Sequence, residues 1–311
     1  MSYSDSIIFG PVPSRRFGIS LGVDLSPSKK QCNFDCLYCE LEGAKTVNSM
    51  DEYPSVSDVI EQIKLSYEKH PKIDVITLTA NGEPTLYPKL DELVDEINKI
   101  KGETKTLILS NGSTIYNNDT FNTLLKIDTV KLSLDCISEK CFKKLDRQDS
   151  SIQIDKIVPS MCEFSKQTKN NFVLEVLFVR TLNDKNEEIE LLYDAIKLIN
   201  PLRVDIGTID RPPAYEVKPV TYEFLEEVAN KFENINTNIV FKNRPKLLQS
   251  YDENEILRTL KRRPLTKEDI SNMFDEKSKE SLEKLVKNEV ISLVSSAGVE
   301  FYKKVWNNLD K

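Results

Sequence analysis

The chain has 311 residues, of which 39% are hydrophobic and 30% charged, and its formal net charge at pH 7 is −7. This length suits one large domain and a small one. The negative charge argues against a broadly basic nucleic-acid surface, although it leaves a local basic patch open. No apolar run approaches the ~20 residues that span a membrane, and the N-terminus lacks the features of a secretory signal. We therefore expect a cytoplasmic protein without a membrane contact.

Short β-branched runs alternate with segments of helical spacing along the first four-fifths of the chain. The predicted strands are Ile19–Leu25, Ile73–Thr79, Thr106–Leu109, Thr129–Leu134, Phe172–Val179 and Leu202–Ile209, with Asn238–Phe241 as an edge strand. The predicted helices are Val56–Tyr67, Leu90–Ile100, Thr120–Leu125, Ile152–Phe164, Glu187–Ile199 and Tyr222–Phe232. Pro159 should interrupt or bound its helix. About six such units predict an α/β fold with a parallel sheet, either open or curled into part of a barrel.

The tail has a pattern of its own, after a polar stretch over Lys242–Asp252. We expect one domain over residues 1–245 and a second over residues 250–311. In the second, Ile256, Leu257 and Leu260 mark a helix, Thr266 and Asp269 open another as a capping box, and Leu282, Leu285 and Val286 mark a third. Val290–Val294 and Val299–Tyr302 then predict a β-hairpin. Three helices followed by a hairpin resemble a winged helix.

Three cysteines, Cys32, Cys36 and Cys39, form the pattern C-x3-C-x2-C. Closely spaced cysteines of this kind hold iron–sulfur clusters, in which each iron takes a thiolate. Three thiolates would serve three irons of a cubane and leave the fourth open to a substrate or cofactor. A structural zinc site is the alternative, but it normally closes with four ligands, and the single histidine, His70, is distant in sequence. A disulfide framework is not expected, because it belongs to small secreted domains.

This pattern, with Tyr38 directly before the third cysteine, resembles the radical S-adenosylmethionine (SAM) enzymes. The run from Gly10 to Gly18, followed by Ser20–Asp24, resembles the stand-alone Fe–S oxidoreductases related to the wyosine (modified tRNA guanosine) synthases. The resemblance covers about the first four-fifths of the chain and implies a partial (β/α)6 barrel. It also implies a [4Fe–4S] cluster whose open iron chelates SAM, and a 5′-deoxyadenosyl radical that abstracts hydrogen from the substrate. A reducing partner such as flavodoxin or ferredoxin and a small-molecule or RNA substrate follow from the same resemblance.

Polar residues follow the second, third and fourth predicted strands, where parallel α/β folds gather functional groups. In the family, a segment like Asn81-Gly82-Glu83-Pro84 holds the SAM ammonium group, so Gly82 and Glu83 are expected to bind SAM. Asn111, Ser133 and Asp135 could bind the ribose hydroxyls, the SAM carboxylate or the substrate. The alternatives are a plain strand-to-helix turn for Gly82–Glu83 and helix caps for the other three.

Several arginines and three further cysteines have less specific interpretations. Arg15, Arg16, Arg147, Arg180 and Arg211 could bind a carboxylate or phosphate. The alternative for Arg147 and Arg180 is an ordinary salt bridge, and the alternative for Arg15, Arg16 and Arg211 is a rigid surface loop that closes the ends of the barrel. Cys136, Cys141 and Cys162 are predicted to be small buried hydrophobes, with a second cluster as the alternative. Wyosine synthases carry an extra cluster on N-terminal cysteines, and no cysteine precedes Cys32. We therefore do not expect their pyruvate chemistry.

The alternative function is a redox-sensing regulator with a cluster or zinc site, whose winged helix binds DNA. Such a helix needs basic residues, because phosphate contacts dominate affinity. Glutamates interleave with the lysines of the third tail helix, and the basic cluster Lys261–Arg263 lies elsewhere. We therefore predict that the tail docks a protein or presents a substrate, with only weak nucleic-acid contact.

Overall fold

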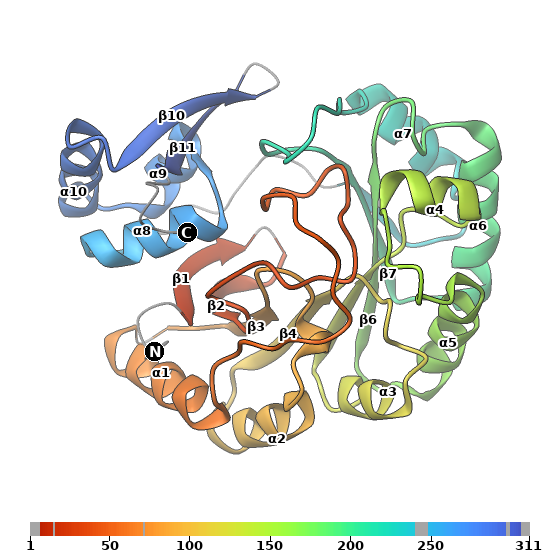
Figure 1. The fold of residues 1–311 in the computed structure, drawn as a ribbon, viewed down its shortest axis with the longest axis horizontal. Coiled ribbons are helices and arrows are strands. Elements are labelled where there is room, and N and C mark those ends of the chain that lie inside the picture. Colours follow the sequence, from red (N-terminus) through yellow and green to blue (C-terminus); the bar gives the residue numbers. More distant parts are fainter. Residues whose placement is uncertain (1–6, 15, 71, 240–247, 297–298, 306–311) are drawn as a thin grey trace.

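The computed structural model describes residues 7–14, 16–70, 72–239, 248–296 and 299–305. Over these residues the main body is an eight-stranded sheet whose strands follow chain order, with helices on its outer side (Figure 1). β1 runs antiparallel to β2, and each later neighbour is parallel. The strands are β1 (Ile8–Ser14), β2 (Gly18–Asp24), β3 (Val75–Thr79), β4 (Lys105–Ser110), β5 (Thr129–Ser133), β6 (Asn171–Phe178), β7 (Arg203–Thr208) and β8 (Thr237–Ile239). The predicted α/β fold with a parallel sheet is confirmed.

Helices connect the parallel strands, as the alternating pattern predicts. They are α1 (Val56–Lys69), α2 (Leu90–Ile100), α3 (Asn118–Leu124), α4 (Glu139–Leu145), α5 (Ile154–Gln167), α6 (Asn186–Ile199) and α7 (Tyr222–Lys231), with a 3₁₀ turn, η1 (Pro84–Leu86). The prediction that Pro159 interrupts or bounds a helix is wrong, because α5 continues through it. A proline removes one backbone donor, and the burial of Ile157, Met161 and Phe164 on the same helix holds it in place. None of the described helices has the length and apolar character needed to cross a membrane.

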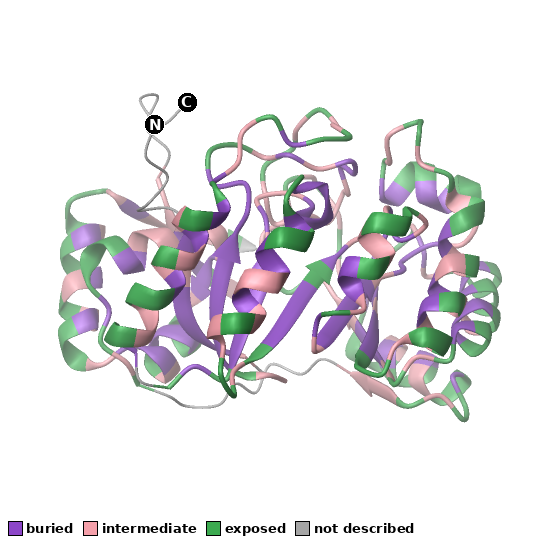
Figure 2. Cartoon of the chain, turned by 90° about the horizontal axis from the view of Figure 1, so that it is seen from below, coloured by how far each residue is buried: buried purple, intermediate pink, exposed green. Residues whose placement is uncertain are grey.

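The two faces of the sheet differ, because successive side chains of a strand point to opposite sides. One face is apolar and packs against the helices, as with Ile76, Leu78, Val130, Leu132, Leu174 and Val176, all fully buried. Figure 2 shows these buried strands behind helices whose outer sides are exposed. The opposite face, here called the inner face, carries Ser20, Thr77, Leu109, Lys131, Glu175 and Asp205. The apolar core therefore lies between sheet and helices, and the inner face is polar.

The tail folds into three helices and a small antiparallel sheet, here called the C-terminal unit (residues 248–305). Its elements are α8 (Glu253–Arg262), β9 (Leu265–Thr266), α9 (Lys267–Met273), α10 (Glu276–Lys287), β10 (Ile291–Ser296) and β11 (Val299–Lys304). Thr266 and Asp269 form the predicted capping box, and β10 and β11 form the predicted hairpin. Its turn and most of the predicted linker lie outside the described residues.

The C-terminal unit packs against the first strand of the sheet (Figure 1). Val12 of β1 belongs to the hydrophobic cluster of this unit, and the Tyr251 hydroxyl donates a hydrogen bond to the Pro11 carbonyl. At the end of α1, Lys69 Nζ lies 2.6 Å from a Glu255 carboxylate oxygen, and His70 Nε2 lies 3.5 Å from the same oxygen. The unit is thus attached through both apolar and charged contacts.

Candidate functional site

The three cysteines lie in the long segment between β2 and α1, which crosses the front of the sheet in Figure 1. The segment is held by backbone hydrogen bonds within itself, such as Val47 N to Cys32 O at 2.8 Å. It is also held by the end of α4, where the Leu145 carbonyl accepts the Leu37 N–H at 2.9 Å. α4 therefore positions the cysteines, although its seven residues are too few for a periodic sequence signal.

The surroundings of the three cysteine thiols suit metal binding better than contact with solvent. Burial raises the pKa of Cys32 to about 12, and it raises the pKa values of Cys36 and Cys39 as well. Donors nevertheless face the sulfurs: the Phe34 N–H lies 3.4 Å from Cys32 Sγ, and Lys30 Nζ lies 3.7 Å from Cys39 Sγ. Metal binding deprotonates such thiols, and N–H donors stabilise the resulting thiolates. This donor set fits an iron–sulfur cluster.

A single zinc ion fits the site less well. Thiolates at about 2.3 Å from one zinc would lie about 3.8 Å apart. In the described part of the chain, the group whose ligand atoms all lie within 4.8 Å of one another is Cys136, Cys141 and Glu188, not the three cysteines of the loop. Wider spacing suits thiolates that each bind a different iron.

Gly82 joins the start of the cysteine loop to the segment after β3. Its φ is +137°, and a Cβ atom there would lie 1.8 Å from the Gln31 carbonyl oxygen. The Gln31 N–H donates to the Asn81 carbonyl at 2.8 Å, and the Glu83 N–H donates to the Gln31 carbonyl at 3.0 Å. Only glycine allows this approach, so Gly82 has a clear structural role.

Glu83 is buried and its carboxylate accepts hydrogen bonds from the protein itself. The donors are Thr85 N at 3.0 Å, Thr85 Oγ1 at 2.7 Å, Ser110 Oγ at 2.7 Å and Asn111 N at 2.8 Å. Burial raises the pKa of Glu83, and these donors oppose the rise. Glu83 caps η1, as the turn alternative requires, and it also fixes Asn111. Its contact with the SAM ammonium group stays a prediction.

Four of the predicted residues, Tyr38, Asn111, Ser133 and Asp135, line one small pocket. The Tyr38 hydroxyl bonds to the Asp135 carboxylate, whose other oxygen accepts the Leu177 N–H at 2.6 Å. Burial raises the pKa of Asp135 to about 7. Phe34, Phe142 and Asp146 also line the pocket. Asp146 has no motif around it that sequence reasoning could have used.

The helix-cap alternative for the strand-end residues is wrong. The caps of α3 and α4 are Asn117 and Ser138, each some residues further along the chain. Asn111 instead directs its amide toward Asn33 Oδ1, at 2.9 Å, and toward Cys32 Sγ, at 3.8 Å. The strand ends thus face the cysteine loop.

Three of the predicted arginines form ion pairs. Arg147 lies 3.1 Å from Asp35, Arg211 lies 3.2 Å from Glu40, and Arg16 pairs with Asp205. Arg180 is exposed, and Arg15 lies outside the described residues. The salt-bridge alternative is therefore confirmed for Arg147, and Arg16 and Arg211 form salt bridges as well.

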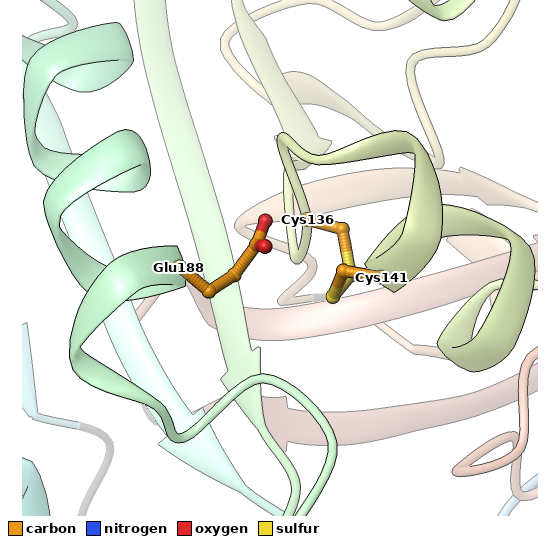
Figure 3. A group of neighbouring side chains, drawn as sticks. All are labelled: Cys136, Cys141 and Glu188. Atoms are coloured by element: carbon orange, nitrogen blue, oxygen red, sulfur yellow. A yellow bond between two sulfur atoms is a disulfide. The ribbon is translucent and has the colours of Figure 1, made fainter.

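Cys136 and Cys141 are buried in the core, as predicted, but they are not free thiols, because they form a disulfide. Their Cα atoms lie 5.6 Å apart, across the turn from β5 into α4. Figure 3 shows Glu188 of α6 directed toward this bond. Its carboxylate accepts the Ser138 N–H at 2.9 Å and so fixes the turn. The five-residue separation of these two cysteines did not predict a compact metal-binding loop. No feature of the sequence between them indicated the turn. Cys162 has a free thiol.

Comparisons with known proteins agree with this geometry. The sequence profile of the radical SAM superfamily matches residues 27–192, more than half of the chain. A UPF0026 protein of Helicobacter pylori is 40% identical over 95% of this chain and 97% of its own length. Among solved structures, a radical SAM methyltransferase from Sphaerobacter thermophilus has the same fold, with a TM-score of 0.56 at 13% identity over 71% of this chain and 66% of that one.

Streptococcus suis SuiB, solved with bound S-adenosylmethionine, is similar with a TM-score of 0.54 at 18% identity, over 70% of this chain and 49% of its own. Superfamily members are enzymes that use a [4Fe–4S] cluster and SAM. From the profile match, the parallel sheet and the cysteine loop at its strand ends, the chain belongs to the radical SAM superfamily.

Proposed function

We propose that Cys32, Cys36 and Cys39 hold the [4Fe–4S] cluster and that SAM binds beside them, in contact with residues that line the small pocket. The observation that supports this most is the convergence of the cysteine loop with Asn111, whose amide faces both Cys32 and Asn33. When bound, the cluster would supply the one-electron reducing chemistry by which SAM is cleaved and hydrogen is abstracted from the substrate. The protein contributes orientation and exclusion of competing reactions.

The surrounding side chains have distinct roles in this proposal. Ser133 and Asn111 offer hydrogen bonds to the ribose hydroxyls or carboxylate of SAM. Gly82 brings its own segment against Gln31, directly before the first cysteine, so the SAM-binding segment and the cluster loop share one backbone contact. Tyr38 and Asp135 form a buried polar wall of the pocket.

The test is SAM cleavage by anaerobically reconstituted protein with dithionite as reductant. We expect 5′-deoxyadenosine, identified by mass spectrometry, from the wild-type protein and none from Cys36→Ala. Full iron content without 5′-deoxyadenosine would contradict the proposal.

The substrate, partner and location are finer parts of the same proposal. We place the protein in the cytoplasm, with flavodoxin or ferredoxin as reductant and a small molecule or an RNA nucleoside as substrate. The RNA option is supported by the sequence run over residues 10–24. We divide the chain into residues 1–245 and 250–311, and we propose that the second part is a winged-helix-like docking domain, on the basis of its three helices and hairpin. Membership of an enzyme family speaks against the regulator alternative.

A further inference from the structure

Five charged side chains meet on the inner face of the sheet, at β5, β6 and β7. This inner charged cluster consists of Arg16, Lys131, Glu175, Arg203 and Asp205. Asp205 contacts Arg16, Lys131 Nζ at 3.7 Å and Arg203 Nε at 2.9 Å. Glu175 contacts Lys131 and lies 3.6 Å from Arg16 Nη2. Three cations face two anions, so the formal net charge of the cluster is +1.

The cluster borders the pocket assigned to SAM. Ser133, which lines that pocket, is the register partner of Glu175 on β6, and Glu175 is the register partner of Asp205 on β7. Neighbouring strands lie about 4.8 Å apart. The cluster therefore begins one strand away from the pocket.

This part of the inner face is open at Glu175 and Leu109, whereas the side chains of Lys131 and Arg16 are only 6% and 16% exposed. The Glu175 side chain is 34% exposed, and Leu109 of β4, the register partner of Lys131, is 38% exposed. Asp205 is fully buried. Burial acts to raise the pKa of Asp205, but the charges of Lys131 and Arg16 hold this pKa below its ordinary value. Asp205 thus anchors the cations, whereas Glu175 remains accessible.

Stability does not explain the arrangement. The attraction between buried charges often does little more than offset their desolvation penalty, and apolar side chains of similar size often stabilise a fold equally well. The opposite face of the same strands already supplies the core through residues such as Val130 and Leu174. Perturbed ionisable groups beside a cofactor pocket are characteristic of functional sites.

We propose that the inner charged cluster binds an anionic oxygen group of the substrate, a carboxylate or a phosphate, through Arg16 and Lys131. Glu175, the exposed carboxylate, accepts a hydrogen bond from a neighbouring hydroxyl or amine of the same substrate. Arginine suits this role because its guanidinium forms paired hydrogen bonds with both groups. The inference deepens the proposed function by naming the substrate class of the same site.

The direct test is anion binding by the full-length protein, without any requirement for SAM cleavage. Inorganic phosphate and succinate are titrated separately by calorimetry at constant ionic strength, to distinguish a phosphate from a carboxylate site. We expect at least one to bind, and Lys131→Met to weaken it at least tenfold, with partial recovery in Lys131→Arg. Lys105→Met is the matched control, because Lys105 also lies on a strand but faces Asp128, at 3.8 Å; its affinity should equal that of the wild type.

The double variant Lys131→Met/Glu175→Gln distinguishes a folding defect from loss of the anion site. It removes the Glu175 carboxylate, which Lys131→Met alone would leave without its lysine partner. Iron content and thermal unfolding are measured for every variant. Absence of binding of both anions by the wild type, or equal affinities in wild type and Lys131→Met, would overturn the inference. Absence of 5′-deoxyadenosine with anion binding intact would instead refute the proposed function alone.

Discussion

Burial raises the pKa of each of the three thiols of the cysteine loop. Iron binds the thiolate form, so binding releases protons. The metal–thiolate bonds must offset the free-energy cost of this deprotonation. Loss of one thiolate leaves an iron without its protein ligand. Replacing Cys36 by Ala should reduce the iron content from about four per chain to a minor fraction, as measured by iron analysis and visible absorbance. Cys162→Ala, with a free thiol elsewhere, should retain the cluster, and a normal spectrum from Cys36→Ala would disprove the assignment.

We predict that Glu83 affects SAM binding through the groups that its carboxylate holds. Its removal leaves the Thr85, Ser110 and Asn111 donors without their acceptor, and each unsatisfied buried donor costs roughly 1–3 kcal/mol. Glu83→Ala should weaken SAM binding at least fivefold while the iron content stays unchanged, because Glu83 is not an iron ligand. Calorimetry of the reconstituted variant measures this, with the exposed Glu139→Ala as control. An unchanged SAM affinity would leave the segment a plain turn.

At the scale of elements, α8 contacts the end of β2 and the start of the cysteine loop through Arg262. Arg262, in its last turn, contacts Asp24 at the end of β2 and donates to the Pro27 carbonyl at 3.1 Å. Asp24 is fully buried and also accepts the Asn81 N–H at 2.8 Å, directly before Gly82. The C-terminal unit is thereby connected to the segment that we propose binds SAM. The predicted basic cluster Lys261–Arg263 accordingly has its central arginine directed inward.

Breaking this pair should lower stability and SAM affinity together. Arg262→Gln leaves a buried carboxylate unpaired, which costs about 3–5 kcal/mol. The double variant Arg262→Gln/Asp24→Asn should recover much of the lost unfolding free energy, as denaturant titration would show. Arg258→Gln, on the same helix, is the matched control. Additive losses in the double variant would show that the two residues do not interact.

Glu255 makes the attachment of the C-terminal unit sensitive to acid. Burial acts to raise the pKa of Glu255, but hydrogen bonds from His70 and Lys69 outweigh burial and lower this pKa to about 2. A depressed carboxyl pKa contributes stability above its ordinary value of 4.5, and this contribution disappears as the pH falls toward 2. The difference in melting temperature between wild type and Glu255→Gln should therefore shrink between pH 6 and pH 3. A difference that stays constant over this range would exclude the mechanism.

Periodicity was sufficient to predict the parallel strands and most helices, because their buried positions recur regularly. It missed β1, whose two prolines, Pro11 and Pro13, do not look like strand residues, and it missed the short α4. The cysteine motif and the strand-end residues of the site were predictable, since a parallel sheet brings strand ends together. Pairings made only by the three-dimensional fold, such as Cys136 with Cys141, had no comparable pattern in the sequence.

For the whole molecule, charge predicts weak contact with nucleic acids. The net charge is −7, and on α10 Lys279 pairs with Glu276 at 2.7 Å. We expect duplex DNA and tRNA to bind the full-length protein with dissociation constants above the micromolar range at physiological salt. Fluorescence anisotropy across a salt series measures this, because each phosphate contact adds to the salt slope. Submicromolar binding of DNA with a steep slope would revive the regulator function.

The packing of α8 against β1 has a consequence for the tendency of the protein to aggregate. β1 is the first strand of an open sheet, and an uncovered outer strand offers backbone groups to other chains. Pro11 and Pro13 remove two of its donors, and Tyr251 occupies the Pro11 carbonyl. A polypeptide ending before residue 248 would expose this strand together with Val12, so we infer that the C-terminal unit also protects the protein from aggregation.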